Sequence, residues 1–294
     1  MNKMDIVCIG NYTKDVIVNP KGTTHVDGGA MNYAAHAAAR LGLKVGVITR
    51  LAQEDNRVIE NLQKAGVACQ VTYTPSSTCV RLEYPGSNPD IRTLYVTGTA
   101  GSISPEEIET FQAEAAVIGT TLRGEVGLDV IQALRRKVPL LACDAQGFVR
   151  VLRGQTLFNE PWEEMRPILA LVDILKADAA EAAFLTGETD IHKAAAWLAE
   201  LGPAEILLTH KDGVLVYAGG HSYDYGFYTE IVNGRSGRGD TCLGSYAAMR
   251  LSKPPEEAGM WAAAVTSLKM GTLGPFQRTV GEVEDLIQRR YVII

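Results

Sequence analysis

Residues 233–246 read NGRSGRGDTCLGSY, in which a loop with three glycines runs directly into a helix. Gly234, Gly237 and Gly239 permit backbone conformations that other residues avoid. Successive N–H groups of such a loop can point into one concavity that binds an anion, and the helix adds partial positive charge at its N-terminus. The stretch therefore predicts a phosphate site at the start of a helix.

A carboxylate and two guanidinium groups accompany this loop. Asp240 stands where the helix begins, either as an N-cap or as a general base that deprotonates an attacking hydroxyl. Arg235 and Arg238 favour an anion, because guanidinium groups pair well with phosphate, although loop arginines can also be simply solvated. Residues 238–240 also spell Arg-Gly-Asp, the tripeptide that adhesion proteins present to integrins, so an extracellular binding protein is the competing interpretation.

The chain on the N-terminal side of this loop alternates apolar strands with helices. The first of these segments are strands at 5–10, 44–52 and 67–74 and helices at 28–42 and 54–66. The alternation predicts βαβ units, and hence one α/β domain with a parallel sheet and helices on both faces. Residues 78–97 contain two β-type runs joined by a turn rich in Pro, Gly, Asn and Asp, which predicts a hairpin outside this pattern.

The composition is typical of a soluble globular protein. The 294 residues are 46% hydrophobic and 21% charged, and a net charge of −6 without any Lys/Arg run argues against nucleic acid as a partner. No apolar stretch approaches the length of about 18 residues that a membrane span needs, and the N-terminus lacks a signal-peptide core. The five cysteines are scattered, so we expect reduced thiols and a cytoplasmic protein, which disfavours an integrin ligand.

Two further stretches are candidates for ligand contacts. In GGAMNY (28–33), Gly28 and Gly29 allow a close approach of ligand or backbone, and Asn32 offers hydrogen bonds at a helix start, although ordinary helix entry needs the same residues. In DAAE (178–181), two carboxylates share one face of a first helical turn, where they suit either the helix dipole or Mg²⁺ held through water. No P-loop, G-x-G-x-x-G, H-E-x-x-H or nucleophile-elbow motif is present.

The order of these motifs resembles the ribokinase (PfkB) family of carbohydrate kinases over essentially the whole chain. GGAMNYAAHAAARLG (28–42) resembles its first signature, SGRGDTCLGSYAA (236–248) its second, and AAAVTSLKMGTLGP (262–275) its adenine-flanking segment. The resemblance implies a three-layer α/β/α sandwich with a mostly parallel central sheet. It also implies a single domain, 1–294, with a small β lid from segments near 12–27 and 78–97.

The resemblance also assigns roles to individual residues. It implies transfer of the ATP γ-phosphate to a substrate hydroxyl, with Asp240 as catalytic base and an anion hole of Gly237, Arg238 and Gly239. Asp15 and Gly29 match substrate-contacting positions. Asp178 and Glu181 match an Asn-x-x-Glu motif linked to phosphate and Mg²⁺, with Glu181 holding the metal through water. The residues expected at the nucleotide are Asp178, Thr209, His210, Lys211, Gly213 and Arg235.

Three departures from the family pattern bear on specificity. The usual D-T-x-G-A-G-D is replaced by residues 234–240, which lack the leading Asp and Thr of a monovalent-cation site, and we hypothesise that Arg235 supplies fixed positive charge instead. The family's T-x-G-x-x-G is replaced by residues 208–213, which alters the nucleotide loop. Tyr33 occupies the column of the family's sugar-binding Asn, with Asn32 one residue early, which argues against a plain ribokinase.

One branch of the family shares these features. DAQGFVRV (144–151), THxxGV (209–214) and GRSGRGDT (234–241) resemble archaeal and bacterial myo-inositol kinases. We therefore expect an ATP- and Mg²⁺-dependent kinase of a polyol, myo-inositol first. The expected substrate contacts are Asp15, Gly28, Gly29, Asn32, Asp90, Arg92 and Gln146, although a Gln at a strand end, such as Gln146, is more often a turn residue. A kinase of another sugar or a nucleoside, and a kinase-fold sensor without catalysis, stay open, as does a monomer against a homodimer through the lid.

Overall fold

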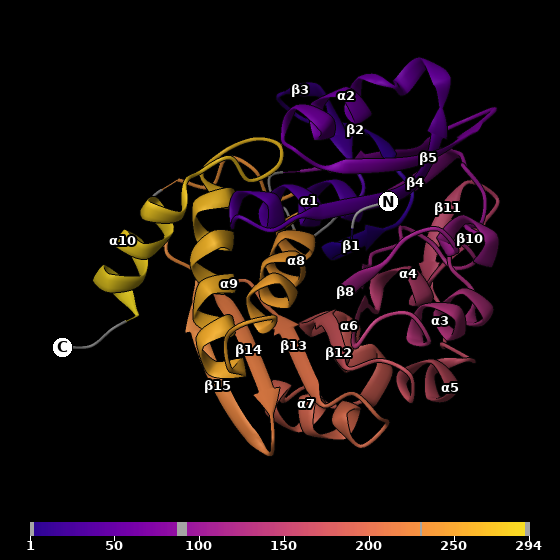
Figure 1. The fold of residues 1–294 in the computed structure, drawn as a ribbon. Coiled ribbons are helices and arrows are strands. Elements are labelled where there is room, and N and C mark those ends of the chain that lie inside the picture. Colours follow the sequence, from indigo (N-terminus) through magenta and orange to yellow (C-terminus); the bar gives the residue numbers. More distant parts are fainter. Residues whose placement is uncertain (1–2, 87–92, 230, 292–294) are drawn as a thin grey trace.

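A computed structural model describes residues 3–86, 93–229 and 231–291 of the chain. In these residues a nine-stranded sheet runs through the molecule in the order β15-β14-β13-β12-β9-β8-β1-β4-β5 (Figure 1). Its strands are β1 (Met4–Ile9), β4 (Val45–Ala52), β5 (Ala68–Thr74), β8 (Ala113–Ile118), β9 (Leu140–Asp144), β12 (Ile174–Asp178), β13 (Glu205–Thr209), β14 (Gly213–Ala218) and β15 (His221–Gly226). All neighbours from β13 to β5 pair in parallel, whereas β14 and β15 are antiparallel.

Helices cover both faces of this sheet. One face packs in a common core with α3 (Leu128–Arg135), α5 (Met165–Leu169), α6 (Ala179–Thr186) and α7 (Ile191–Ala199). The other face packs with α1 (Ala30–Arg40), α2 (Arg57–Lys64), α8 (Arg238–Arg250) and α9 (Pro255–Met270). A third cluster joins α10 (Val280–Arg290) to α9 and α1. The expected three-layer α/β/α sandwich with a mostly parallel sheet is therefore confirmed.

The direction of chain progression reverses beside β1. From β1 the chain proceeds to β4 and β5 on one side, and β8 then pairs on the other side and is followed by β9, β12 and β13. In such sheets, ligands bind outside the carboxyl ends of the strands at this reversal point. The backbones that leave β1 and β8 come very close there, because a Cβ on Gly10 would lie 2.0 Å from the carbonyl oxygen of Gly119.

A smaller six-stranded sheet, in the order β10-β11-β7-β6-β2-β3, stands beside the sandwich. Its strands are β2 (Thr13–Asn19), β3 (Gly22–Gly28), β6 (Thr78–Glu83), β7 (Thr93–Gly98), β10 (Arg150–Arg153) and β11 (Thr156–Asn159). The hairpin expected over 78–97 is confirmed by the antiparallel pairing of β6 with β7. The last two strands were not anticipated; they join the sheet through Thr156 opposite Tyr95.

Short segments complete the connections between these elements. They are 3₁₀ turns at Gln53–Asp55 and Pro105–Ile108 and the one-turn helix α4 (Gln146–Val149). All five cysteines are free thiols, with Cys8, Cys143 and Cys242 buried. Among the helices of the described residues, none combines the length and the apolar character that crossing a membrane requires.

Candidate active site

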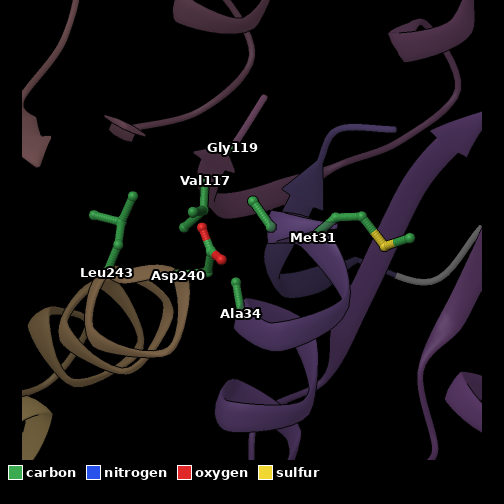
Figure 2. A pocket seen from close by; sticks show the side chains of 7 residues that line it. Met31, Ala34, Val117, Gly119, Asp240 and Leu243 are labelled. Atoms are coloured by element: carbon green, nitrogen blue, oxygen red, sulfur yellow. The ribbon is translucent and has the colours of Figure 1, made fainter. Parts of the chain in front are cut away.

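Two helices begin on opposite sides of the reversal point in the sheet. A small pocket there is lined by the first turns of α1 and α8 and by the end of β8: Ala30, Met31, Ala34, Val117, Gly119, Asp240 and Leu243. Figure 2 shows the Asp240 carboxylate pointing from α8 into this space. Both helices begin at a glycine, Gly29 or Gly237, that provides no side-chain cap. Their uncapped first turns favour negative charge in front of them.

Two positions at the start of α8, the N-cap Gly237 and Gly239 in the first turn, require glycine. Gly237 has a φ of 74°, in the left-handed region, and a Cβ there would lie 2.2 Å from the ring of Tyr33. Gly239 is not strained, but a Cβ there would lie 2.6 Å from the ammonium nitrogen of Lys176. The loop can therefore lie directly on Tyr33 and Lys176 only because these two positions lack side chains.

A buried ion pair lies under Gly239. Lys176 on β12 and Asp144 on β9 are neighbours in the parallel register, and the Lys176 ammonium donates to the Asp144 carboxylate at 2.8 Å. Both residues are almost fully buried. Asp144 Oδ1 also accepts from the backbone N–H of Gln146 at 3.0 Å, which fixes the carboxylate at the strand end. Burial opposes the charge of Lys176, but Asp144 and the other nearby carboxylates raise the pKa of Lys176; burial raises the pKa of Asp144, and Lys176 opposes that rise.

Asp240 lies among groups of both charges. Burial raises its pKa above the ordinary value, while the positive charges of Lys176, Arg150 and Lys269 oppose that rise. A carboxylate with a raised pKa takes up a proton more readily, as a general base must.

The site also contains buried polar atoms that lack partners among the described residues. Asp15 Oδ1, Asn32 Oδ1 and the Tyr33 hydroxyl are buried and make no hydrogen bond in the described residues. Burial and the nearby negative charges of Asp240 and Asp27 raise the pKa of Asp15 to about 6. Gly28 is in close contact with Asp15, since a Cβ at Gly28 would lie 2.4 Å from the Asp15 carboxylate. Buried polar atoms in proteins rarely lack partners, so this group points to a ligand with hydroxyls or waters.

Asp178 and Glu181 form a capping box at the start of α6. The Asp178 side chain accepts from the Glu181 N–H at 2.8 Å, and the Glu181 carboxylate accepts from the Asp178 N–H at 2.9 Å. The second Glu181 oxygen lies 3.6 Å from the Arg150 guanidinium. The described residues contain no group of three or more His, Cys, Asp or Glu side chains that could hold a metal. A directly ligated metal centre therefore does not fit, whereas Mg²⁺ held through water beside Glu181 is compatible.

The expected nucleotide loop is a tight turn between β13 and β14. Thr209 ends β13 beside Asp178 of β12, and the His210 N–H donates to the Gly213 carbonyl at 2.9 Å. Lys211 and Asp212 are exposed at the tip and lie 3.6 Å from each other. Burial lowers the pKa of His210. A role of this turn in binding the nucleotide therefore stays a prediction.

The predicted site residues thus divide into groups. The α1 and α8 starts bring together Asp15, Gly28, Gly29, Asn32, Gly237, Arg238, Gly239 and Asp240. Asp178, Glu181 and Thr209 lie at the adjacent strand ends, with Gln146 supporting Asp144. Arg235 is exposed and Lys211 is at a loop tip. Asp90 and Arg92 lie outside the described residues. Sequence reasoning missed Asp144, Arg150, Lys176 and Lys269, although charges inside the apolar runs ILKA and SLKM were a visible signal.

Known proteins with this sequence pattern and fold are kinases. Residues 2–277 match the pfkB family of carbohydrate kinases. Among curated proteins, none matches the chain significantly. A pyrophosphate-dependent kinase of the ribokinase family, solved with sulfate, is 34% identical, with a TM-score of 0.89 and 95% of this chain and 99% of that chain covered.

Two more solved structures are of the same kind. A pyrophosphate-dependent myo-inositol-1 kinase, converted by two substitutions into a myo-inositol-3 kinase, is 32% identical with a TM-score of 0.88, covering 98% and 100%. A pyrophosphate-dependent ribokinase-family kinase in complex with a pyrophosphate analogue and myo-inositol is 33% identical with a TM-score of 0.87, covering 95% and 99%. The resemblance to the myo-inositol kinase branch is thereby confirmed. The chain belongs to the pfkB family of carbohydrate kinases and is a phosphotransferase that acts on a sugar or polyol hydroxyl.

Proposed function

We propose that this kinase transfers a phosphoryl group from pyrophosphate to a hydroxyl of a cyclic polyol of the myo-inositol class. In the reaction, the acceptor oxygen forms a bond to one phosphorus of pyrophosphate, and the bridging P–O bond breaks. The hydroxyl proton passes to the Asp240 carboxylate, and orthophosphate leaves. Asp240 acts as general base, and the uncapped first turn of α8 holds the transferred group.

The observation that carries the acceptor assignment is the group of unpaired polar atoms around Asp240. Asp15 Oδ1, Asn32 Oδ1 and the Tyr33 hydroxyl are buried and have no hydrogen-bond partner within the described part of the chain. An unsatisfied buried polar atom costs roughly 1–3 kcal/mol, which a ligand that pairs with it recovers. A molecule with a hydroxyl on every ring carbon can satisfy several of these atoms at once, and the two carboxylates accept from hydroxyls rather than repel them. A polyol without charge fits this group better than a sugar phosphate.

Fixed positive charges near Asp240 support pyrophosphate as the donor. Lys176, Arg150 and Lys269 all act on Asp240 electrostatically, and Lys176 lies directly behind Gly239. Phosphoryl transfer depends mainly on positioning and on neutralising charge on the phosphates. Cations built into the protein meet these needs for a donor that has no nucleoside. The three similar structures are described as pyrophosphate-dependent, which points in the same direction.

Mg²⁺ fits this site as an ion held mainly by the donor. Its usual coordination in kinases combines one or two carboxylates with substrate phosphates and several waters. Glu181 is the residue that would contact it through water, because one Glu181 oxygen faces Arg150 rather than a backbone N–H. The metal would neutralise charge on the donor phosphates.

ATP is the second candidate donor, and one surface feature favours it. Ile231, Val232 and Leu273 are exposed apolar side chains close to the loop that precedes α8. When an adenine base covers apolar surface of this kind, the burial favours binding by about 25 cal/mol per Å². The ATP dependence expected from the sequence therefore stays a prediction beside pyrophosphate.

A matrix of donors and acceptors tests the proposal. Release of orthophosphate or ADP is measured with pyrophosphate or ATP against myo-inositol, other inositol isomers, ribose, fructose, fructose 6-phosphate and nucleosides. We expect turnover with pyrophosphate and an inositol, and none from an Asp240→Asn control that still folds. Turnover with ATP alone would replace the donor assignment, and turnover only with a nucleoside or sugar phosphate would refute the acceptor assignment.

A further inference from the structure

Lys269 is a buried lysine that the family assignment does not explain. It lies near the end of α9, and only 1% of its surface is exposed. Buried lysines are rare unless their charge is satisfied. Among the described residues, no carboxylate lies within ion-pair distance of its ammonium group. Its charge must therefore be satisfied in another way.

The ammonium of Lys269 is held by the loop that forms the start of α8. It donates to the carbonyl oxygen of Gly234 at 2.9 Å and to that of Ser236. It also lies 5.0 Å from the centre of the Tyr33 ring, within reach of a cation–π interaction. Two carbonyls of one short loop and an aromatic face thus converge on a single positive charge.

These contacts determine where the loop's N–H groups point. In a trans peptide the carbonyl and the following N–H point in opposite directions, and the chain has no cis peptide bond in the described residues. Carbonyls of Gly234 and Ser236 that face Lys269 therefore aim the N–H groups of Arg235 and Gly237 away from it. N–H groups of one loop that are directed to the same side can contribute to a binding place for an anion.

The end of α9 holds the same loop by its backbone as well. The N–H groups of Asn233 and Gly234 both donate to the Met270 carbonyl, at 2.9 and 3.1 Å. Gly234 lies so close to the Thr272 carbonyl that a Cβ would be 2.4 Å from it. The loop is therefore anchored at residue 234 by the backbone, and Lys269 alone reaches past the anchor to Ser236.

We propose that Lys269 is a positioning residue whose ammonium serves as a built-in cation for the anion-binding loop, so that catalysis needs no dissolved monovalent cation. Two loop carbonyls that converge without Lys269 would need water or a free cation between them. The structure assigns this function to Lys269 rather than to Arg235, which is exposed and was the candidate from sequence. The activity part of this proposal rests on the proposed function.

The buried environment of Lys269 makes its positive charge unfavourable, which is consistent with a functional role for that charge. Burial lowers its pKa to about 8, with Arg238 acting in the same direction and Asp240 opposing it. Desolvation of an ammonium is unfavourable, and an uncharged side chain of similar length would avoid it. Asp240 and the two loop carbonyls that accept from the ammonium favour the charged form of Lys269.

The first measurement needs no substrate. Hydrogen exchange of the amides in 233–240 is compared among wild type, Lys269→Met and a matched control, Lys253→Met. Lys253 is also a lysine over an aromatic ring, 5.6 Å from the Trp261 ring centre, but is paired with Glu257 away from the loop. We expect faster exchange in 233–240 only in Lys269→Met, with the rest of the protein unchanged. Unchanged protection of this loop in Lys269→Met would overturn the proposal.

The second measurement is activity at constant ionic strength in KCl, NaCl or tetramethylammonium chloride. Wild type should turn over at the same rate, within about twofold, in all three salts. Lys269→Ala should lose on the order of 100-fold in rate, as expected for a misplaced reacting group, and recover partly with ammonium ions but not with tetramethylammonium. Many-fold activation of wild type by K⁺ would overturn the proposal. If no donor and acceptor support turnover, the proposed function fails, whereas the exchange experiment still tests Lys269.

Discussion

Replacing Gly237 with alanine tests whether the loop before α8 is shaped by its contact with Tyr33. Gly237 has a φ of 74°, where an alanine costs roughly 1–2 kcal/mol. The added Cβ would also lie 2.2 Å from ring atoms of Tyr33, a separation that no relaxed structure tolerates. Tyr33 is buried against the site, so the ring or the loop must move by about 1 Å or more. A displacement of that size can reduce kcat/KM by about 100-fold.

Gly187→Ala provides the matched control for this substitution. Gly187 ends α6 with a φ of 76°, and a Cβ there would meet no atom within 4 Å. Both variants carry the same backbone strain, and only Gly237→Ala adds the overlap with Tyr33. Urea unfolding measures the stability of each variant, and steady-state kinetics measures kcat/KM. We expect about 1–2 kcal/mol of destabilisation and normal kcat/KM for Gly187→Ala, and a larger loss of both quantities for Gly237→Ala.

A second substitution tests whether the contact with Tyr33 causes the loss of stability and of kcat/KM in Gly237→Ala. Combining Gly237→Ala with Tyr33→Ala removes the ring that the new methyl group meets, so part of the lost stability should return relative to the sum of the single changes. Equal stability and equal kcat/KM for Gly237→Ala and Gly187→Ala would refute the reasoning, because the overlap would then have no consequence.

Three further changes follow from the same geometry. Asp240→Asn should fold normally and lower kcat by roughly 10²- to 10⁴-fold, as steady-state kinetics would show; a rate within tenfold of wild type would exclude Asp240 as the base. Asp144→Asn leaves the Lys176 charge buried without its 2.8 Å partner and should cost about 3–5 kcal/mol in urea unfolding, so an unchanged midpoint would contradict a charged pair. Asp15 has its pKa raised to about 6, so its contribution favours the folded state at low pH and is lost as pH rises through 6. Asp15→Asn should therefore gain stability relative to wild type between pH 5 and pH 7.5 in parallel urea titrations, and an equal difference at both pH values would argue against the shift.

Much of the sandwich could be predicted from periodicity, because its elements have strong local signals. The helix expected over 28–42 is α1, with glycines at both ends, and the strand expected over 44–52 is β4 with its buried apolar run. The strands β10 and β11 escaped prediction because each has only four residues. Such short strands are stabilised by pairing, β10 with β11 and β11 with β7, rather than by their own composition.

The sequence predicts an anion site at the glycine loop, but the residues that support this loop were not assigned. Lys176 and Asp144 are 32 residues apart and meet only through the register of β9 and β12. Lys269 belongs to α9, which follows the glycine loop in the chain and folds back to contact it. Strand register and helix packing are set by tertiary structure. The sequence alone therefore gave only a weak signal for these residues, which was a lysine inside an apolar run.

The pair Asp178 and Glu181 shows how one pattern serves two purposes. The spacing D-x-x-E fits both a capping box and carboxylates beside a metal. The structure pairs the Asp178 side chain and one Glu181 oxygen with backbone N–H groups, and the other Glu181 oxygen lies 3.6 Å from the Arg150 guanidinium. The capping box is therefore present, and contact of Glu181 with a metal through water stays a prediction.

The most direct test of the account follows the phosphorus atoms themselves. Purified protein is incubated with pyrophosphate, myo-inositol and Mg²⁺, and the mixture is monitored by ³¹P NMR beside the Asp240→Asn variant. We predict that the pyrophosphate signal declines while one phosphomonoester and one orthophosphate appear in equal amounts, and that the variant leaves pyrophosphate intact. Pyrophosphate hydrolysed to orthophosphate without a phosphomonoester, or no reaction with either pyrophosphate or ATP, would contradict phosphoryl transfer to a polyol at this site.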